Sequence, residues 1–399
     1  MKLHSTETFW PLKNSMAKSY PSLQDSISTP ILIIGGGITG ALIAYKLIQQ
    51  GKKAILVDKR DVCNGSTAAS TALLQYEIDI SLHDLIKKRG IDCSVDSYKN
   101  CEKAIYDLKA IVDHLKSDCG FEFKKSIYFC ALKKDLKFLK TEFETRKKYG
   151  LDVKWLDEKD LKKIGLNAFA AIESKSGATL DPYRLAQDLL HYCKEKGMQI
   201  FDRTDIVTLK KQDGKILAVT NTNCKIRAQH VIHCTGYESV EMLSNAVVDL
   251  KSTYVTLSES YINLPPVFKN AIYWNTASPY LYFRSTPDGR IIAGGGDEEF
   301  KDPERRDKLM PLKESYLLKQ FKKYFPGIPF IPDYTWAGTF GETKDGLPYF
   351  GKSNSKKNEH FVLGFGGNGI TFSVLGMNSI ISSLENLPHP DLEYYKFGR

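Results

Sequence analysis

The chain has 399 residues, a formal net charge of +9, and a composition of 42% hydrophobic and 26% charged residues. This length allows a large core and more than one domain, and the composition is that of a globular protein. No run of about 18 apolar residues is present, which excludes a transmembrane helix. The first 28 residues lack the apolar core of a signal peptide, so we expect a cytoplasmic protein.

The eight cysteines show no C-x-x-C spacing. Neither a zinc site nor a disulfide framework is therefore predicted, and we expect reduced cysteines in the core and no metal. The lysines are dispersed along predicted amphipathic helices. Such a distribution is typical of solvated helix faces, so nucleic acid is not an expected partner.

The first recognisable unit follows a polar arm, residues 1–28, which we expect to pack along the surface. The apolar strand Ile31–Ile34 meets the turn Gly35-x-Gly37-x-x-Gly40 and a helix, and a second apolar strand ends on Asp58. This is the βαβ dinucleotide fingerprint. Its glycines permit the tight turn, the approach of backbone N–H groups to a pyrophosphate, and close helix–strand packing. The helix N-terminus attracts phosphate, and the carboxylate accepts hydrogen bonds from ribose hydroxyls.

A run of small and hydroxylated residues follows at 64–72. It lets the backbone lie close to a long ligand and supplies hydroxyl donors, with a short helix beginning near Ser66. Beyond it, Gln75, Glu77 and Asp79 share one face if the backbone is extended. Apolar periodicity then predicts helices over 95–115, 135–148 and 158–164 and a strand over 127–132.

The middle of the chain continues with further strands and helices. Residues 183–196 predict a helix, and residues 207–219 predict a hairpin. The apolar strand at 231–236 ends in Thr235-Gly236, where the backbone can again lie close to a ligand. His233 lies inside this strand, and we interpret it as a packed, hydrogen-bonded residue.

The last third of the chain begins with alternating residues that predict antiparallel strands over 251–300. Tyr280, Tyr282 and Arg284 share one face of them. A second glycine-rich loop, residues 364–369, precedes a C-terminal helix. A loop of this kind at a helix N-terminus can cradle anionic or carbonyl groups.

Four glycine-rich segments, residues 35–40, 64–72, 234–236 and 364–369, each follow an apolar strand. One long ligand that spans a domain explains all four, and FAD fits them better than a nicotinamide dinucleotide. With these motifs the sequence resembles the D-amino-acid oxidase and glycine/sarcosine oxidase family of FAD-dependent oxidoreductases over nearly its whole length. The residues that carry the resemblance are Gly35–Gly40, Asp58, Gly65–Ser70, Cys234–Gly236, Thr343–Pro348 and Gly366–Gly369.

The resemblance implies an α/β fold with two discontinuous domains. A Rossmann-like FAD-binding domain, built on the βαβ unit and a parallel sheet, would comprise residues 1–82, 173–247 and 337–399. A substrate domain with a mixed or antiparallel sheet covered by helices would comprise residues 83–172 and 248–336.

The resemblance also assigns the cofactor site. The glycine turn would bind the pyrophosphate, Asp58 the adenosine ribose, and the loop at 366–371 the pyrimidine edge of the flavin. Some sarcosine oxidases of this family attach the flavin to a cysteine at the place of Gly338, so we expect the FAD here to be non-covalent. The expected cofactor residues are Gly35, Gly37, Ile38, Thr39, Gly40, Asp58, Lys59, Ser66, Thr67, Ala68, Ser70, Thr71, Ala72, Val207 (through its backbone, to the adenine), Thr235, Gly236, Gly338, Gly366, Gly367, Asn368, Gly369, Ile370 and Thr371.

Substrate recognition departs from the family pattern. Glycine oxidases carry a carboxylate-binding arginine where this chain has Phe340. We expect Arg284 to replace it, because the arginine fork binds a carboxylate in a bidentate manner. The alternative is a surface ion pair of Arg284 with Asp297 or Glu298.

The other expected substrate residues are aromatic or acidic. Tyr254, Tyr282 and Trp274 would wall the site, with core packing as the alternative. Glu77 would hold a distal ammonium of a polyamine-like substrate, or else be a solvated loop acid. Strand 290–294 offers only aliphatic residues where some sarcosine oxidases carry an oxygen-activating lysine, which favours a dehydrogenase over an oxidase.

The resemblance therefore implies an FAD-dependent enzyme that oxidises a C–N bond of a small amine or amino acid by hydride transfer to flavin N5. Its partners would be this substrate and an electron acceptor, either O2 or another carrier. One alternative is a 2-hydroxy-acid dehydrogenase, which would need a histidine base, and His83 is not well placed for that role. An alternative from a different class, suggested by the +9 charge, is an RNA-binding or RNA-modifying flavoprotein.

Overall fold

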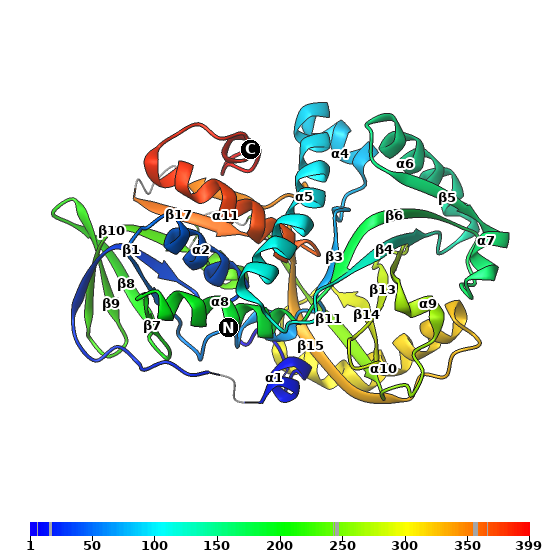
Figure 1. The fold of residues 1–399 in the computed structure, drawn as a ribbon, viewed down its shortest axis with the longest axis horizontal. Coiled ribbons are helices and arrows are strands. Elements are labelled where there is room, and N and C mark those ends of the chain that lie inside the picture. The colour runs from blue at the N-terminus through cyan, green and yellow to red at the C-terminus, as the bar shows by residue number, and fades with distance from the viewer. Residues whose placement is uncertain (6, 16–17, 242, 244–246, 354–357, 365) are drawn as a thin grey trace.

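The computed structural model describes the 399 residues except 6, 16–17, 242, 244–246, 354–357 and 365. Within the described residues the strands form two sheets, each with helices packed against it (Figure 1), so the predicted α/β class is confirmed. No helix in the described ranges is long and apolar enough to cross a bilayer. The helices are α1 (Phe9–Asn14), α2 (Ile38–Gln49), α3 (Ser66–Ala69), α4 (Leu82–Arg89), α5 (Ile91–Leu115), α6 (Leu136–Lys148), α7 (Glu158–Lys163), α8 (Pro182–Glu195), α9 (Pro266–Lys269), α10 (Pro303–Tyr324), α11 (Gly369–Glu385) and α12 (Pro390–Tyr394).

The first sheet contains the βαβ unit that the glycine motif predicts. Its described strands run in the order β16-β17-β10-β1-β2-β7, and β8 and β9 extend it from β10 as an antiparallel ribbon. β1 pairs in parallel with β2 and with β10, as expected for an apolar strand buried on both faces. The strands are β1 (Ile27–Ile34), β2 (Ala54–Val57), β7 (Gln199–Phe201), β8 (Ile206–Gln212), β9 (Lys215–Thr220), β10 (Lys225–His233), β16 (Tyr349–Lys352) and β17 (Glu359–Leu363).

Alternate side chains of β1 fill two different cores, because successive strand residues point to opposite faces of a sheet. Ile31 and Ile33 pack in the core that includes α2 and α8. Leu32 and Ile34 pack in the core formed with β8, β9 and β10. Since β17, β10, β1 and β2 are parallel, their carboxyl ends meet at one edge of the sheet, where ligands of α/β proteins bind.

The second sheet is antiparallel except for one pair. Its described strands run in the order β15-β11-β14-β13-β12-β4-β6-β3, with β5 paired to β6, and only β12 and β4 are parallel among these pairs. Helix α10 packs against β11, β14 and β15. The strands are β3 (Leu73–Gln75), β4 (Glu122–Phe129), β5 (Val153–Asp157), β6 (Ala170–Thr179), β11 (Asp249–Ser258), β12 (Ala271–Asn275), β13 (Leu281–Ser285), β14 (Ile291–Glu298) and β15 (Pro332–Glu342).

Several observed element boundaries differ from the predicted ones because pairing partners extend the strands. The strand expected at 127–132 is β4, which begins at Glu122 because that residue already pairs with Thr179 of β6. The domain boundaries expected at residues 173 and 337 fall inside β6 and β15, which both belong to the second sheet. Apolar periodicity reports local burial and does not report where a distant partner strand begins.

The N-terminal arm is inserted into the molecule instead of lying on its surface as expected. Trp10 in α1 is fully buried, and its Nε1 donates a hydrogen bond to the Ser70 carbonyl at 2.6 Å. Closer to the terminus, the Leu3 carbonyl accepts from the Thr339 backbone N–H at 2.6 Å, so the arm pairs with β15. The average composition of these 28 residues is polar, but burial of Trp10 and its apolar neighbours stabilises the inserted position of the arm.

Candidate functional site

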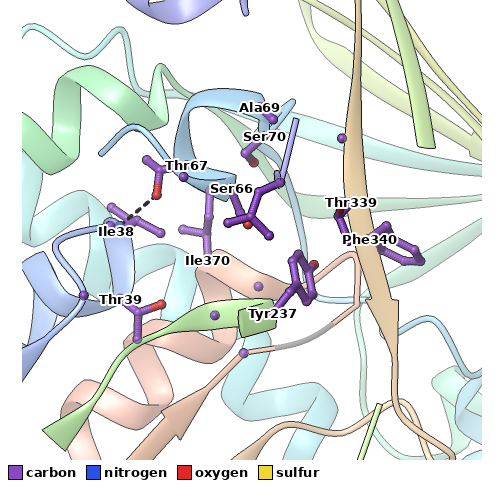
Figure 2. A pocket seen from close by; sticks show the side chains of 18 of the residues that line it. Ile38, Thr39, Ser66, Thr67, Ala69, Ser70, Tyr237, Thr339, Phe340 and Ile370 are labelled. Carbon is purple, nitrogen blue, oxygen red and sulfur yellow. Dashed lines mark hydrogen bonds between the residues drawn. The ribbon is translucent and has the colours of Figure 1, made fainter. Parts of the chain in front are cut away.

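A cavity of about 300 Å³ lies at the edge where β1, β2, β10 and β17 end (Figure 2). The loops that follow these strands and the α3 segment line one side of it, and residues of β11, β13, β14 and β15 line the other side. All four glycine-rich segments that predicted one long ligand contribute to the lining. Phe365, in the last of these segments, lies outside the described residues.

The glycine turn after β1 has the geometry that close backbone approach requires. Gly35 adopts a φ of +105°, which favours glycine. A Cβ at Gly40 would lie 1.8 Å from the Gly35 carbonyl oxygen, so only glycine lets α2 pack this closely on the turn. A Cβ at Gly37 would lie 2.9 Å from the Thr67 hydroxyl. Thr67 also accepts a hydrogen bond from the Ile38 N–H at 2.9 Å, which fixes the α3 segment against the start of α2 (Figure 2).

Asp58 lines the cavity directly after β2 and is held by backbone donors. Its Oδ2 accepts from the Gly36 N–H at 2.7 Å, and its Oδ1 accepts from the Arg60 N–H at 2.8 Å. Burial raises the pKa of Asp58 to about 6, although these two hydrogen bonds oppose the shift. The Arg60 guanidinium beside it pairs with Glu238 at 2.7 Å. This end of the cavity therefore presents a fixed carboxylate.

Three buried polar atoms in the lining have no hydrogen-bond partner within the described chain, and one of them is Asp297 Oδ1. The other two are Ser66 Oγ in α3 and Oδ1 of Asn368, whose Nδ2 donates to the Gln75 carbonyl at 3.0 Å. Asn368 is only 3% exposed, and buried polar atoms in folded proteins are nearly always satisfied. These orphaned atoms therefore fit a polar ligand that fills the cavity.

The loop before α11 also contributes polar groups to the cavity lining. Gly366 has a φ of +75°, and a Cβ there would lie 2.3 Å from the Asp79 carboxylate. The Gly367 N–H donates to Asp79 Oδ2 at 2.8 Å, so Asp79 secures the loop. The described residues of α11 and its loop from Gly366 to Thr371 all line the cavity. The N-terminus of α11 can stabilise negative charge on a ligand.

The second sheet closes the opposite end of the cavity with aromatic and acidic side chains. Tyr280, Tyr282 and Asp297 line it together with Thr253. Burial raises the pKa of Asp297 to about 6, against a hydrogen bond from Thr253 and the positive charge of Lys251. This end is the part of the cavity that could hold a reacting group.

Arg284 lies outside the cavity lining, although it follows Tyr282 on the same face of β13. Its guanidinium is fully buried 5.4 Å from the Trp10 ring centroid, and its Nη2 donates to the Leu180 carbonyl at 3.1 Å. Burial lowers its pKa to about 9. The expected surface pair with Asp297 or Glu298 is wrong as well, because Glu298 pairs with Lys313 and Arg284 is not on the surface. Residues i and i+2 of a strand are about 7 Å apart, and this spacing from Tyr282 places Arg284 beyond the cavity.

Two of the expected aromatic residues are placed in cores. Tyr254 lies between Thr253 and Val255 on β11, and those two neighbours line the cavity, so Tyr254 points to the opposite face and packs with α10. Trp274 stacks on Tyr128 at a ring-centroid distance of 3.7 Å and is buried. Core packing, the stated alternative, holds for both residues.

The two acids expected on one face with Gln75 have separate roles. Glu77 is fully buried and pairs with Arg146 at 3.1 Å, so it is neither a substrate ligand nor a solvated acid. Asp79 holds the loop before α11, as described above. Because the backbone leaves β3 at Gln75, the alternation expected for an extended chain stops there.

The remaining expected residues fall close to the cavity or pack beneath it. Thr204, Asp205 and Ile206 line the cavity, whereas Val207, whose backbone was expected to contact the adenine, is not among the lining residues and is 58% exposed. Gly40 and Ala68 lie beneath the lining and not in it. The expected cofactor residues that do line it are Gly35, Gly37, Ile38, Thr39, Asp58, Lys59, Ser66, Thr67, Ser70, Thr71, Ala72, Thr235, Gly236, Gly338, Gly366, Gly367, Asn368, Gly369, Ile370 and Thr371.

Both histidines weighed from the sequence lie away from the lining. His233 donates or accepts a hydrogen bond with Glu359 at 2.7 Å and stacks on Phe361, so its interpretation as a packed residue is confirmed. His83 hydrogen-bonds Glu142 through Nδ1 at 2.8 Å. Neither ring faces the cavity.

Several lining residues were missed, above all Leu3, Tyr237, Thr253 and Asp297. For Asp297 a signal exists in the sequence, because it directly follows the run Gly294–Gly296 inside a strand. Consecutive glycines in a strand mark a close approach of another group. For Leu3 no signal exists, since its place depends on pairing with β15.

The chain matches the family model of FAD-dependent oxidoreductases (DAO) over residues 30–377, and it belongs to that family. The Bacillus subtilis (strain 168) protein YhfW, whose name describes a Rieske 2Fe-2S iron-sulfur protein, is 26% identical over 96% of this chain and 74% of its own length. Glycine oxidase of Bacillus licheniformis is 25% identical over 85% of this chain and 88% of its own length. The solved glycine oxidase of Geobacillus kaustophilus has the same fold, with a TM-score of 0.78 and 17% identity over 93% of this chain and 99% of its own.

FAD, the cofactor of this family, suits the cavity described above. The glycine turn and the loop before α11 leave room that a Cβ would fill, and Ser66 and Asn368 supply unpartnered polar atoms. Asp58 would hold the adenosine ribose, and the residues from Gly366 to Thr371 would lie beside the flavin.

Proposed function

We propose that this chain oxidises a C–N bond of a small amine or amino acid. The observation that carries the proposal is the continuous lining from Asp58 at the first sheet to Tyr282 and Asp297 at the second. A cofactor with its ribose at Asp58 and its ring at the far end would meet a substrate at the tyrosines. Relatives named glycine oxidase and gamma-glutamylputrescine oxidoreductase, the latter from Escherichia coli (strain K12) and 22% identical over 96% of this chain, support this class of reaction.

The chain's own residues would position the substrate and exclude water. The chemistry that FAD supplies when bound is acceptance of a hydride at N5 from the carbon beside nitrogen. Tyr280 and Tyr282 would cover the substrate, and positioning of this kind lowers the entropic part of the barrier. The N-terminus of α11 would stabilise negative charge that develops on the ring beside it. With the proposed division into a cofactor domain and a substrate domain, the reaction would take place between the two sheets.

The test is to purify the protein, record its visible spectrum, and add amines and amino acids without air. Loss of the flavin absorption with one of these compounds is the expected result. A colourless protein that FAD does not reconstitute, or a flavin that none of these compounds reduces, would contradict the proposal. Acid precipitation should release the flavin into the supernatant, since we propose that it is held without a covalent bond. Return of colour on admitting air would show that O2 is the acceptor, and no return would show another carrier.

The alternative 2-hydroxy-acid dehydrogenase finds no support in the lining. No histidine is among the described residues that line the cavity, and His83 is engaged with Glu142. Lactate and malate are therefore included as substrates that should leave the flavin oxidised.

A further inference from the structure

We propose that the substrate end of this site binds a cationic amine that has no carboxylate beside the reacting carbon, and that Asp297 holds its ammonium group. The proposal rests on the proposed oxidation and names the substrate class for it. Three independent observations carry it: the partners of the acids, the place of the basic groups, and the aromatic wall.

Three acids gather at the substrate end, and they differ in how they are satisfied. Glu342 at the end of β15 forms an ion pair with Lys251 at 2.8 Å. Asp79 accepts from the Gly367 N–H at 2.8 Å and lies 3.4 Å from the Tyr280 hydroxyl. Asp297 lines the cavity, and its buried Oδ1 has no hydrogen-bond partner among the described residues. A buried carboxylate oxygen without a partner is costly, and a bound ammonium would satisfy it.

The pKa of Asp297 also depends on the charges of the other two acids. The pKa of Asp297 rises to about 6, first through burial and further through the charges of Glu342 and Asp79. The same burial raises the pKa of Asp79 to about 6. A substrate carboxylate placed here would face this negative field, whereas a cation would be attracted by it.

The basic groups of the lining lie at the opposite end of the cavity. Lys59 and Arg60 follow Asp58, and both pair with Glu238. At the substrate end, Phe340 lines the cavity, and Arg284 is buried outside the lining. Among the described lining residues no cation is therefore available there to bind a carboxylate.

The aromatic wall suits a cation as well. Tyr280 and Tyr282 both line the cavity, with ring centroids 6.1 Å apart. The face of an aromatic ring attracts a cation, and the attraction is stronger where water is excluded. Burial raises the pKa values of both tyrosines, and the nearby charge of Asp297 raises them further. The Asp297 carboxylate and the two tyrosine rings therefore line the same part of the cavity.

The first experiment measures binding without turnover on the FAD-loaded protein. Benzyltrimethylammonium, which has no oxidisable N–H, and phenylacetate, which has the same ring and the opposite charge, are titrated while the flavin spectrum is recorded. The cation should bind at least tenfold more tightly than the anion. Asp297→Asn should raise the Kd of the cation at least tenfold, and Asp297→Glu, which keeps the charge, should restore most of it.

Glu299→Gln is the matched control. Glu299 lies two residues after Asp297 and its side chain is 83% exposed, so this substitution removes the same charge outside the cavity. It should leave the Kd of the cation within twofold of the unaltered protein. Tighter binding of phenylacetate than of the cation, or an Asp297→Asn protein that keeps its flavin and an unchanged Kd for the cation, would overturn the proposal.

The second experiment separates this inference from the proposed reaction. Ethylamine is compared with alanine, and putrescine with ornithine, as anaerobic reductants of the flavin. Reduction by the amines alone supports both proposals. Reduction by the amino acids alone overturns the cationic-amine site and leaves the C–N oxidation standing. If no compound reduces the flavin while the cation still binds through Asp297, the proposed C–N oxidation is contradicted and the proposed cation site is supported.

Discussion

The ring of Tyr282 occupies the space that a side chain at Gly294 would need. The two residues are partners in the pairing of β13 with β14, and a Cβ at Gly294 would lie 2.2 Å from the Tyr282 ring. Tyr282 thereby lies flat on β14 while it lines the cavity. We predict that Gly294→Ala forces the ring toward the cavity and lowers kcat/KM at least tenfold.

The measurement is steady-state kinetics together with the flavin content of the purified variant. Gly327→Ala is the matched control, because a Cβ at Gly327 meets no atom within 4 Å. Equal kinetics of the Gly294→Ala protein and the unaltered one would show that the ring can move aside without cost.

Thr67 fixes the α3 segment to the first turn of α2 through the Ile38 N–H. Thr67→Val keeps the shape of the side chain and removes the acceptor, which leaves a buried N–H unsatisfied at a cost of about 1–3 kcal/mol. We predict that FAD binds about tenfold more weakly, as measured by quenching of FAD fluorescence in a titration of the apoprotein. Thr67→Ser keeps the hydroxyl and should bind FAD as the unaltered protein does; a Val variant with the same affinity as the Ser variant would contradict the assignment.

The binding of FAD should depend on pH through Asp58. Its pKa is raised to about 6 by burial, so the carboxylate that would accept hydrogen bonds from the ribose hydroxyls is present above pH 6 and is lost as the pH falls through this value. The Kd for FAD should therefore rise by about tenfold per pH unit below 6 and be constant between pH 7 and 8. Asp58→Asn should bind FAD more weakly at pH 8 and show no rise between pH 7 and 5. A wild-type Kd that does not change down to pH 5 would exclude this role.

The stability of the fold should depend strongly on Arg146. Its guanidinium is fully buried between Glu77 at 3.1 Å and Glu142 at 2.7 Å, both also fully buried. Arg146→Met leaves two buried carboxylates without their partner, which should lower the free energy of unfolding by about 3–5 kcal/mol. Urea unfolding followed by circular dichroism measures this change.

Two further variants define the cause of that loss. Lys147→Met alters the neighbouring exposed residue and should change the stability by less than about 0.5 kcal/mol. Adding Glu77→Gln to Arg146→Met removes one of the two unpaired charges and should recover part of the loss. A double variant that is less stable than the single one would mean that the buried charge is not the cause.

The cofactor half of the site could be predicted because its signals are local. The turn from Gly35 to Gly40 and the acid Asp58 are fixed by one strand, one helix and the next strand, all between Ile27 and Asp58. The loop from Gly366 to Thr371 is also recognisable in the sequence, because its glycines directly precede a helix. In the two glycine-rich segments the backbone forms the site, and backbone conformation follows from the nearby sequence.

The substrate half could not be predicted because it depends on which strands become neighbours. Tyr254 and Arg284 have plausible chemistry for the site, and β11 turns one away from the cavity while β13 carries the other past it. Glu77 is claimed by Arg146 of α6, a partner 69 residues away in the chain. No periodicity in the sequence encodes such pairings, and the acid that does reach the cavity, Asp297, is distinguished only by the glycines before it.

The interleaved first sheet also orders events during synthesis on the ribosome. β10 lies between β1 and β17, and the residues from Gly366 to Thr371 close the cavity from the far end of the chain. The first glycine turn, Asp58 and α3 lie within the first 70 residues, whereas the wall formed by residues 366–371 exists only after almost the entire polypeptide has been made. The cavity lining is therefore complete only late in synthesis, and a chain that stops before α11 would lack the wall formed by residues 366–371.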